Sequence, residues 1–228
     1  MTSLKKHFDQ VRVRIQQAEN SSNRQGKVQL LAVSKKKTAA MIREAYALGQ
    51  RSFGESYVQE AVNKIKELSY INDICWHFIG LIQSNKTQDI SSYFQWAHSV
   101  CRLKIAKRLS EQRPATSPPL NICLQVTTSE KNITSGVEIA DLSELALAVS
   151  VLPGLKLRGL MTLPPAETDQ KKQTKAFRVL AKQLSFLNKT HNLAMDTLSM
   201  GMTSDLEVAI QEGATIVRIG TALFGARV

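Results

Sequence analysis

Residues 197–202 read TLSMGM and residues 216–221 read IVRIGT, and these two stretches decide the fold of this 228-residue chain. Each begins as a short apolar run typical of a buried strand and then runs into a glycine close to a hydroxyl side chain. Glycine lets the backbone approach a ligand closely, so that N–H groups can point at phosphate oxygens. In a (β/α)8 barrel, phosphate often binds at the loops after strands 7 and 8. The two stretches therefore predict such a barrel, provided that six strands precede them.

The sequence ahead of residue 197 supplies six further runs typical of strands. The eight predicted strands are Val28–Val33, Arg51–Gly54, Trp76–Ile79, Phe94–His98, Leu120–Val126, Leu157–Met161, Thr197–Met200 and Ile216–Ile219. The helical patterns between them are Ala39–Leu48, Val58–Leu68, Leu103–Glu111, Leu142–Leu152, Lys171–Asn188 and Ser204–Glu212. Several of these strands are almost wholly apolar, as expected when both faces of a parallel sheet are buried.

This alternation predicts an α/β fold with parallel strands and crossover helices. A doubly wound sheet and a closed barrel both fit the order of the elements. No GxGxxG pattern follows the first strand, which disfavours the dinucleotide-binding version of the doubly wound sheet. The glycine-containing ends of strands 7 and 8 favour the other solution, and we predict a single (β/α)8 TIM-type barrel.

An extra element precedes the first strand. Apolar residues recur there at steps of four and three, as in an amphipathic helix, at Leu4, Phe8, Val11, Ile15 and Ala18. A polar loop that includes Gly26 follows this helix. We expect residues 1–228 to form one domain, in which the helix and loop of residues 1–26 pack on the outside of the barrel.

Composition narrows the classes of function. The chain is 43% hydrophobic and 21% charged, and no apolar run approaches the roughly 20 residues that a membrane helix needs. Charges throughout the first 20 residues exclude an apolar signal-peptide core, so we expect a cytoplasmic protein with no membrane partner. Its three cysteines, Cys75, Cys101 and Cys123, lie far apart, which argues against a zinc site or a disulfide framework.

The net charge of +11 raises the question of nucleic acid. Aromatic residues make up only 6% of the chain and do not alternate with basic residues, and no helix-turn-helix, RRM or zinc-finger pattern occurs. We interpret the charge as a solvated basic surface that attracts small anions, and not as a specific nucleic-acid site. No long exposed apolar heptad run remains once the helices are assigned to the barrel, so we expect a monomer.

The end of the first predicted strand carries a candidate reactive lysine. The strand runs into SKKK at residues 34–37, and three consecutive lysines are usually a solvated loop. Lys35 differs in its position, because a side chain there can point over the mouth of the barrel. A lysine that is partly desolvated beside other cations can form a Schiff base with an aldehyde.

Arg218 lies within the eighth strand between apolar residues and needs an acceptor, because an unpaired buried charge is costly. That acceptor is either an acid inside the barrel, such as Glu55, or a ligand's ring nitrogen or phosphate. We interpret His77, in WHFIG, as a core residue. Since the sequence shows no Ser/His/Asp triad, no carboxylate pair at a useful spacing and no metal cluster, we assign no catalytic residue and no metal ligand.

Several motifs together resemble one known family. AVSK, FGE-x-YVQE, WHFIG-x-x-QSNK, LRGLM, TLSMGM-x-x-D-x-x-x-AI and VRIGTA-x-FGAR follow one another across nearly the whole chain. In this order they resemble the pyridoxal phosphate homeostasis proteins (YggS/PROSC type). The resemblance implies the barrel of the alanine racemase N-terminal domain and a pyridoxal 5′-phosphate held as a Schiff base.

The resemblance also assigns residues to the cofactor. Lys35 corresponds to the Schiff-base lysine, and Arg218 to the arginine that faces the pyridine nitrogen. The phosphate cradle corresponds to Ser199, Gly201, Met202, Gly220 and Thr221. Ser56 stands where the family commonly has an asparagine at the cofactor ring, so that contact is expected to be lost or bridged by water. Thr134 stands where a second aldehyde-reactive lysine is common, which argues against a handover through that position.

The resemblance implies a protein that binds pyridoxal phosphate, buffers it and supplies it to pyridoxal phosphate-dependent apoenzymes, without efficient catalysis of its own. A guanidinium at the ring nitrogen leaves that nitrogen unprotonated and weakens the ring as an electron sink. We also expect no second β-domain, from which racemases with this barrel take a catalytic tyrosine. The alternatives are an amino-acid racemase of low activity that uses Lys35 as its base, or a barrel for another phosphorylated metabolite or nucleic acid.

Overall fold

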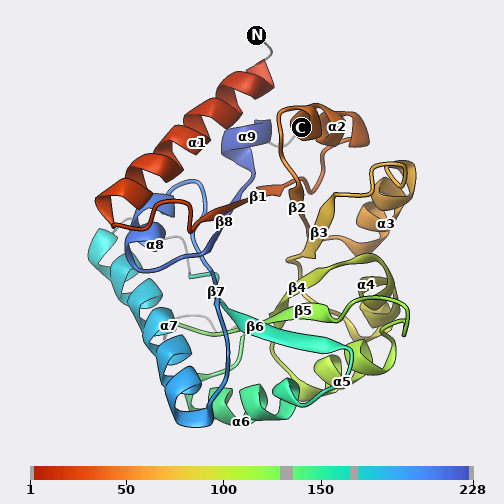
Figure 1. Ribbon diagram of the computed structural model, residues 1–228, viewed down its shortest axis with the longest axis vertical. Helices are drawn as coiled ribbons and strands as arrows, with labels where there is room; N and C mark the ends of the chain where they lie inside the picture. Colours follow the sequence, from red (N-terminus) through yellow and green to blue (C-terminus); the bar gives the residue numbers. More distant parts are fainter. Residues whose placement is uncertain (1–2, 129–135, 165–168, 226–228) are drawn as a thin grey trace.

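The computed structural model describes residues 3–128, 136–164 and 169–225, and in it eight parallel strands close into a barrel (Figure 1). The strands follow chain order around the barrel: β1 Gln29–Val33, β2 Ser52–Glu55, β3 Cys75–Phe78, β4 Trp96–Val100, β5 Leu120–Gln125, β6 Leu155–Met161, β7 Thr197–Ser199 and β8 Ile216–Ile219. β1 pairs with β8 as well as with β2, with Leu31 opposite Arg218, so the sheet has no free edge. The predicted TIM-type barrel is confirmed and the doubly wound alternative is wrong.

Helices cover the outside of the barrel between successive strands (Figure 1). They are α1 Ser3–Ser21, α2 Ala39–Ala47, α3 Val58–Glu67, η1 Ser84–Lys86, α4 Thr87–Tyr93, α5 Leu103–Glu111, α6 Ile139–Ser150, α7 Gln170–His191, α8 Leu206–Gln211 and α9 Thr221–Phe224. The sequence analysis missed η1, α4 and α9. The seven residues of α4, TQDISSY, include one buried apolar side chain, Ile90, so they show no apolar stripe.

One glycine allows two neighbouring strands to approach each other. In β6, a Cβ built on Gly159 would lie 1.8 Å from the carbonyl oxygen of Thr197 in β7. No larger residue fits at this contact without a shift of the backbone. The glycine of LRGLM, Gly159, is therefore required where β6 pairs with β7.

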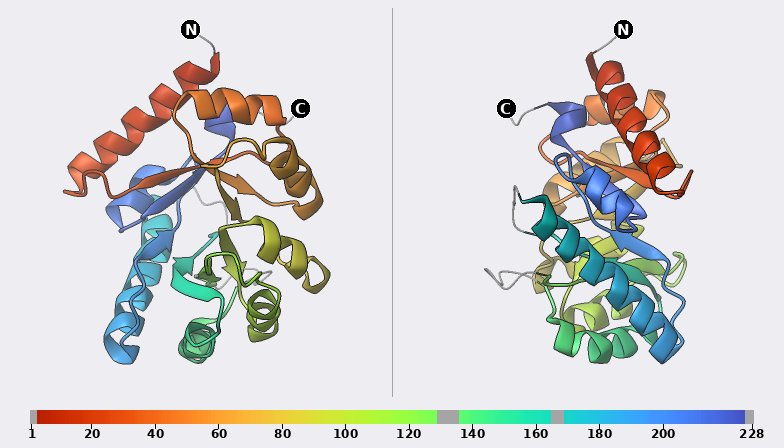
Figure 2. Two further views of the ribbon diagram at one scale, coloured as in Figure 1. Left: turned by 45° about the vertical axis from the view of Figure 1, so that its right-hand side comes forward. Right: turned by 90° about the vertical axis from the view of Figure 1, so that its left-hand side faces the viewer.

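The N-terminal helix α1 packs on α8 and α9 (Figure 2). Phe8 is fully buried and meets Phe224 of α9 edge to face, with ring centroids 6.0 Å apart. Arg14 forms an ion pair with Glu207 of α8 at 2.7 Å. After the helix, Arg24 donates hydrogen bonds to the carbonyl oxygens of Ile210, near the end of α8, and of Gly213 and Ala214, which follow it.

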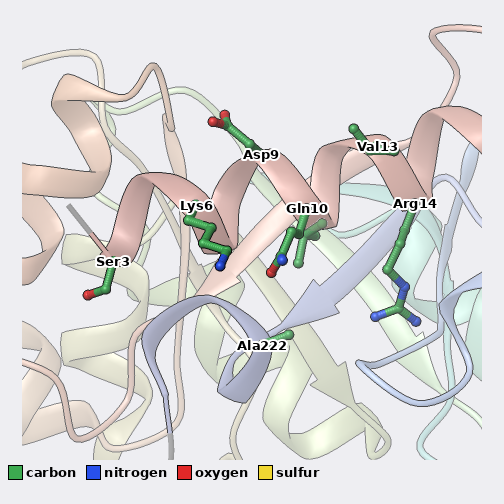
Figure 3. A pocket seen from close by; sticks show the side chains of 8 residues that line it. Ser3, Lys6, Asp9, Gln10, Val13, Arg14 and Ala222 are labelled. Atoms are coloured by element: carbon green, nitrogen blue, oxygen red, sulfur yellow. The ribbon is translucent and has the colours of Figure 1, made fainter. Parts of the chain in front are cut away.

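A groove runs between α1 and α9 on the surface (Figure 3). Lys6, Gln10 and Arg14 point from α1 toward Ala222 of α9, whereas Val13 points away and is half exposed. Because α9 directly follows β8, the N-terminal helix covers the element that opens at Gly220-Thr221.

Within the described residues, no helix is long and apolar enough to cross a membrane. Cys75, Cys101 and Cys123 are free thiols, and Cys123 is buried in the barrel. Burial raises the pKa of Cys123 to about 12, so this thiol stays protonated.

The packing of α1 can be tested by truncating Phe8. We expect Phe8→Ala to lower the free energy of unfolding by about 3–5 kcal/mol, because it leaves a cavity against Phe224. Val13→Ala, on the half-exposed face of the same helix, is the control and should change stability by less than about 0.5 kcal/mol. Denaturant unfolding measures both, and equal small effects would show that α1 does not belong to the cooperative unit.

Candidate functional site

The carboxyl ends of parallel strands share one mouth of the barrel, and the predicted site residues lie around it. Lys35 lies in the turn two residues after β1 and is partly buried. Gly220, after β8, lies beside Val33, the last residue of β1: a Cβ built on Gly220 would lie 3.4 Å from Cβ of Val33. Lys37 Nζ also reaches the carbonyl oxygen of Gly225, at 3.4 Å. Closure of β1 on β8 thus brings the lysine turn beside the last glycine motif.

Hydrogen bonds fix the turn on both sides of Lys35. Before it, the buried Ser34 donates from its backbone N–H to Gly54 O at 2.9 Å and from its hydroxyl to Glu55 Oε1 at 2.7 Å. After it, Lys36 has a left-handed backbone with φ of 60° and donates its N–H to Glu60 Oε1 at 2.6 Å. The position of Lys35 along the chain is therefore held by acceptors from β2 and α3.

A buried lysine joins these acceptors into one cluster. Lys64 Nζ lies 2.9 Å from Glu55 Oε1, 2.5 Å from Glu60 Oε1 and 2.8 Å from the carbonyl oxygen of Ser34. Glu55 is completely buried, and its Oε2 has no hydrogen-bond partner among the described residues. Burial raises the pKa of Glu55, and the Lys64 ammonium opposes that shift.

This arrangement corrects one expectation. Glu55 was one possible acceptor for Arg218, and the structure pairs it with Lys64 instead. Arg218 donates from Nη1 to Ser199 Oγ at 2.7 Å and from Nη2 to Thr162 O at 2.8 Å. Burial lowers the pKa of Arg218 to about 10, so the guanidinium is still charged at neutral pH.

The loop after β7 needs its glycine. Gly201 has a φ of +91°, and a Cβ there would lie 2.6 Å from Cβ of Ala209. Its carbonyl oxygen accepts the N–H of Arg218 at 2.9 Å, which ties this loop to β8. The next N–H, that of Met202, donates to the carboxylate of Asp205. The loops after β7 and β8 are thus held together by backbone contacts, with the exposed Thr221 opening α9.

The hydroxyl of Ser199 lies inside the barrel. It accepts from Arg218 and lies 2.8 Å from Nδ1 of His98, and its side chain is completely buried. The phosphate contact predicted for Ser199 stays a prediction. His77 is buried beside His98, in agreement with its interpretation as a core residue.

The structure brings most of the predicted residues to one mouth of the barrel, and two further positions need separate comment. Ser56 follows β2 at this mouth and is half-buried. Thr134 lies outside the described residues. The sequence analysis missed Lys64 and His98. Lys64 follows Glu60 by four residues, a helical ion-pair spacing that was available as a signal, whereas nothing in the sequence linked His98 to Ser199.

No group of three or more His, Cys, Asp or Glu side chains within residues 3–128, 136–164 and 169–225 is arranged to hold a metal ion. The charged groups at the mouth are instead lysine, arginine and one buried acid–base cluster. A cationic mouth with glycine-containing loops suits a phosphorylated ligand.

Comparison with known proteins places this arrangement in context. The family model for the alanine racemase N-terminal domain matches residues 7–228. A relative from Pseudomonas aeruginosa, named pyridoxal phosphate homeostasis protein, is 54% identical over 100% of this chain and 97% of its own length. A relative of the same name from Escherichia coli is 46% identical over 100% of this chain and 98% of its own.

Solved structures agree with the fold. PipY of Synechococcus elongatus, solved with PLP bound, is 39% identical and superposes with a TM-score of 0.82 over 92% of this chain and 100% of its own. An alanine racemase from Clostridium difficile is 12% identical, with a TM-score of 0.75 over 96% of this chain and 57% of its own. The racemase likeness supports the barrel fold alone.

The cluster below Lys35 can be tested through Lys64. We expect Lys64→Met to cost about 3 kcal/mol of unfolding free energy, because it leaves the Glu55 charge buried without its partner. Lys66→Met, on the exposed side of the same helix, is the matched control and should be near neutral.

Adding Glu55→Gln to the Lys64→Met variant should recover part of the loss, since it removes the uncompensated charge. Denaturant unfolding of the three variants gives the comparison. Equal stability of wild type and Lys64→Met would refute the role given to this cluster.

Proposed function

The chain belongs to the alanine racemase N-terminal domain family and, within it, to the pyridoxal phosphate homeostasis proteins, and on this premise we propose that it binds pyridoxal 5′-phosphate reversibly at the mouth of its barrel. We propose further that it buffers the cofactor and supplies it to other enzymes. The observation that carries the proposal is the fixed turn of Lys35, which follows the strand that lies beside Gly220, while the loop after β7 is tied to β8 by the hydrogen bond from Arg218 N–H to Gly201 O.

The residues present fit this cofactor. A lysine amine is required for covalent attachment of the aldehyde, and Lys35 supplies it from a turn held on both sides. Gly201 is required by its packing, because a Cβ there would lie 2.6 Å from Cβ of Ala209. Neither Gly201 nor Gly220 carries a side chain, so a phosphate could approach their backbones closely. In this proposal Met202 and Thr221 complete the cradle with Ser199, and Ser56 lies beside the ring.

Arg218 decides between a carrier and an enzyme. Bound pyridoxal phosphate supplies an electron sink for amino-acid chemistry, which is strongest when the ring nitrogen is protonated. A charged Arg218 directed at that nitrogen disfavours its protonation. We therefore propose that the protein has no efficient catalysis of its own, and assign no catalytic residue.

The second candidate function is an amino-acid racemase of low activity, for which the family membership is the reason. Incubation of the loaded protein with L-alanine distinguishes the two functions, with chiral chromatography as the readout. We expect no D-alanine above the rate given by free pyridoxal phosphate. Turnover at enzymatic rates, abolished in Lys35→Ala, would overturn the carrier proposal.

Partners and location belong to the same proposal. The chain, taken as one domain of residues 1–228, would act as a monomer in the cytoplasm, with pyridoxal phosphate-dependent apoenzymes as recipients. The basic surface, with a net charge of +11, favours an anionic ligand such as this cofactor, and no specific nucleic-acid partner is proposed.

The cofactor and its lysine can be tested by visible absorption. Wild type mixed with pyridoxal phosphate should show a protein-bound visible band; borohydride should bleach this band and leave the cofactor permanently attached to the protein, and Lys35→Ala should lose both the band and the attachment. Lys36→Ala is the matched control, since Lys36 is the exposed neighbour in the same turn, and it should keep the band. Absence of the band in wild type would refute the proposal, whereas a band that persists in Lys35→Ala would transfer the role to a neighbouring lysine.

A further inference from the structure

A chain of buried polar side chains crosses the barrel interior from Arg218 to Cys75. Arg218 Nη1 lies 2.7 Å from Ser199 Oγ, which lies 2.8 Å from His98 Nδ1. His98 Nε2 lies 2.9 Å from His77 Nδ1, and His77 Nε2 lies 3.4 Å from Cys75 Sγ. The chain links β8, β7, β4 and β3, and no step of the proposed function uses the two histidines.

Both histidines are neutral. Neither side chain has any exposed surface, and burial lowers the pKa of His77 to about 3 and that of His98 well below its usual value. A neutral imidazole carries one N–H donor and one acceptor nitrogen. Each ring therefore accepts one hydrogen bond and donates one. Which nitrogen donates is set by the groups at the two ends of the hydrogen-bonded series, Arg218 and Cys75.

Counting donors gives that direction. Arg218 can only donate, so Ser199 Oγ accepts from it and has one O–H left. If this O–H donates to His98 Nδ1, then His98 donates from Nε2 to His77, and His77 donates from Nε2 to the thiol of Cys75. Every group is then satisfied.

The opposite direction leaves a group unsatisfied. His98 would donate from Nδ1 to a Ser199 hydroxyl that already accepts from Arg218, and no described contact would accept the Ser199 O–H. A buried hydroxyl without an acceptor costs about 1–3 kcal/mol. The first direction therefore prevails.

We propose that His98 and His77 are positioning residues that hold Arg218 in place through this one-way chain of hydrogen bonds. The Arg218 side chain donates to two acceptors, the hydroxyl oxygen of Ser199 and the backbone carbonyl oxygen of Thr162. His98 Nδ1 accepts the hydrogen bond of the Ser199 O–H, and this keeps the Ser199 oxygen turned toward the guanidinium. The effect on a bound ligand rests on the proposed function, because it requires that Arg218 face the cofactor ring.

Neighbouring side chains hold this series of hydrogen bonds from Arg218 to Cys75, called the relay below, in a rigid arrangement. The ring of Trp96 stacks on His77, with centroids 5.3 Å apart and planes 8° from parallel. The guanidinium of Arg158 lies over the Trp96 ring, 4.9 Å from its centroid, and forms an ion pair with Asp196. Stacking of this kind fixes the plane of the imidazole and with it the line of the hydrogen bond to His98.

The direction of the relay can be measured in the protein without cofactor. Nitrogen-15 NMR of histidine-labelled protein identifies the protonated nitrogen of each ring, and the signals are assigned with His77→Phe and His98→Phe. We expect both His77 and His98 to carry the proton on Nε2. A proton on Nδ1 of either ring would overturn the proposal, whatever the protein binds.

The positioning role is tested with pyridoxal phosphate itself. His98→Phe removes the acceptor for Ser199 and should weaken binding roughly tenfold, the equivalent of about one hydrogen bond, and shift the bound absorption band. His98→Asn keeps a polar atom near the position of Nδ1 and should restore most of the affinity. His191→Phe, in the outer helix α7, is the matched control and should bind as wild type does.

The outcomes separate the two proposals. If wild type shows no bound band, the proposed function fails. The NMR result alone then decides whether the hydrogen bonds of the relay run in the proposed direction. If wild type binds and His98→Phe binds with the same affinity and spectrum, the positioning role is overturned. Thermal unfolding of each variant shows whether it is folded, and an unfolded His98→Phe leaves the decision to His98→Asn and to the tautomers in wild type.

Discussion

The parallel pairing of β1 with β8 is the contact on which the rest of this structure depends. Four residue pairs, from Gln29 with Ile216 to Ala32 with Ile219, remove the last free edge of the sheet. The same pairing brings the lysine turn after β1 beside the glycine after β8, although the two lie at opposite ends of the sequence. The geometry of the mouth is therefore a direct product of barrel closure.

The barrel holds two buried cations in different ways. Lys64 is neutralised by carboxylates, whereas Arg218 is held by a hydroxyl and a carbonyl, with neutral histidines behind the hydroxyl. Ion pairing suits a group with a structural role, because a nearby carboxylate cancels the charge. A guanidinium whose hydrogen-bond acceptors are both neutral keeps more of its field than one paired directly with a carboxylate.

The sequence was sufficient for the barrel, its N-terminal helix and the location of the mouth, because these follow from apolar periodicity and from glycines at strand ends. It was insufficient for the short polar helix α4, which buries too little apolar surface to show a period. Of the acceptors it offered for Arg218, Glu55 was wrong, and the Ser199 hydroxyl and the Thr162 carbonyl were not among them. Contacts between side chains of different strands, such as that of Ser199 with His98, depend on barrel register and leave no local pattern.

The packing of α1 on α8 and α9 has a consequence for how the chain folds during synthesis. The partners of Phe8 and Arg14 are Phe224 and Glu207, about 200 residues later. On the ribosome, the apolar face of the first helix must wait for almost the entire chain to emerge before it can be covered. Such non-local contacts slow folding and leave hydrophobic surface exposed until the contacts form. The nascent chain therefore exposes the apolar face of α1 until α9 has been synthesised.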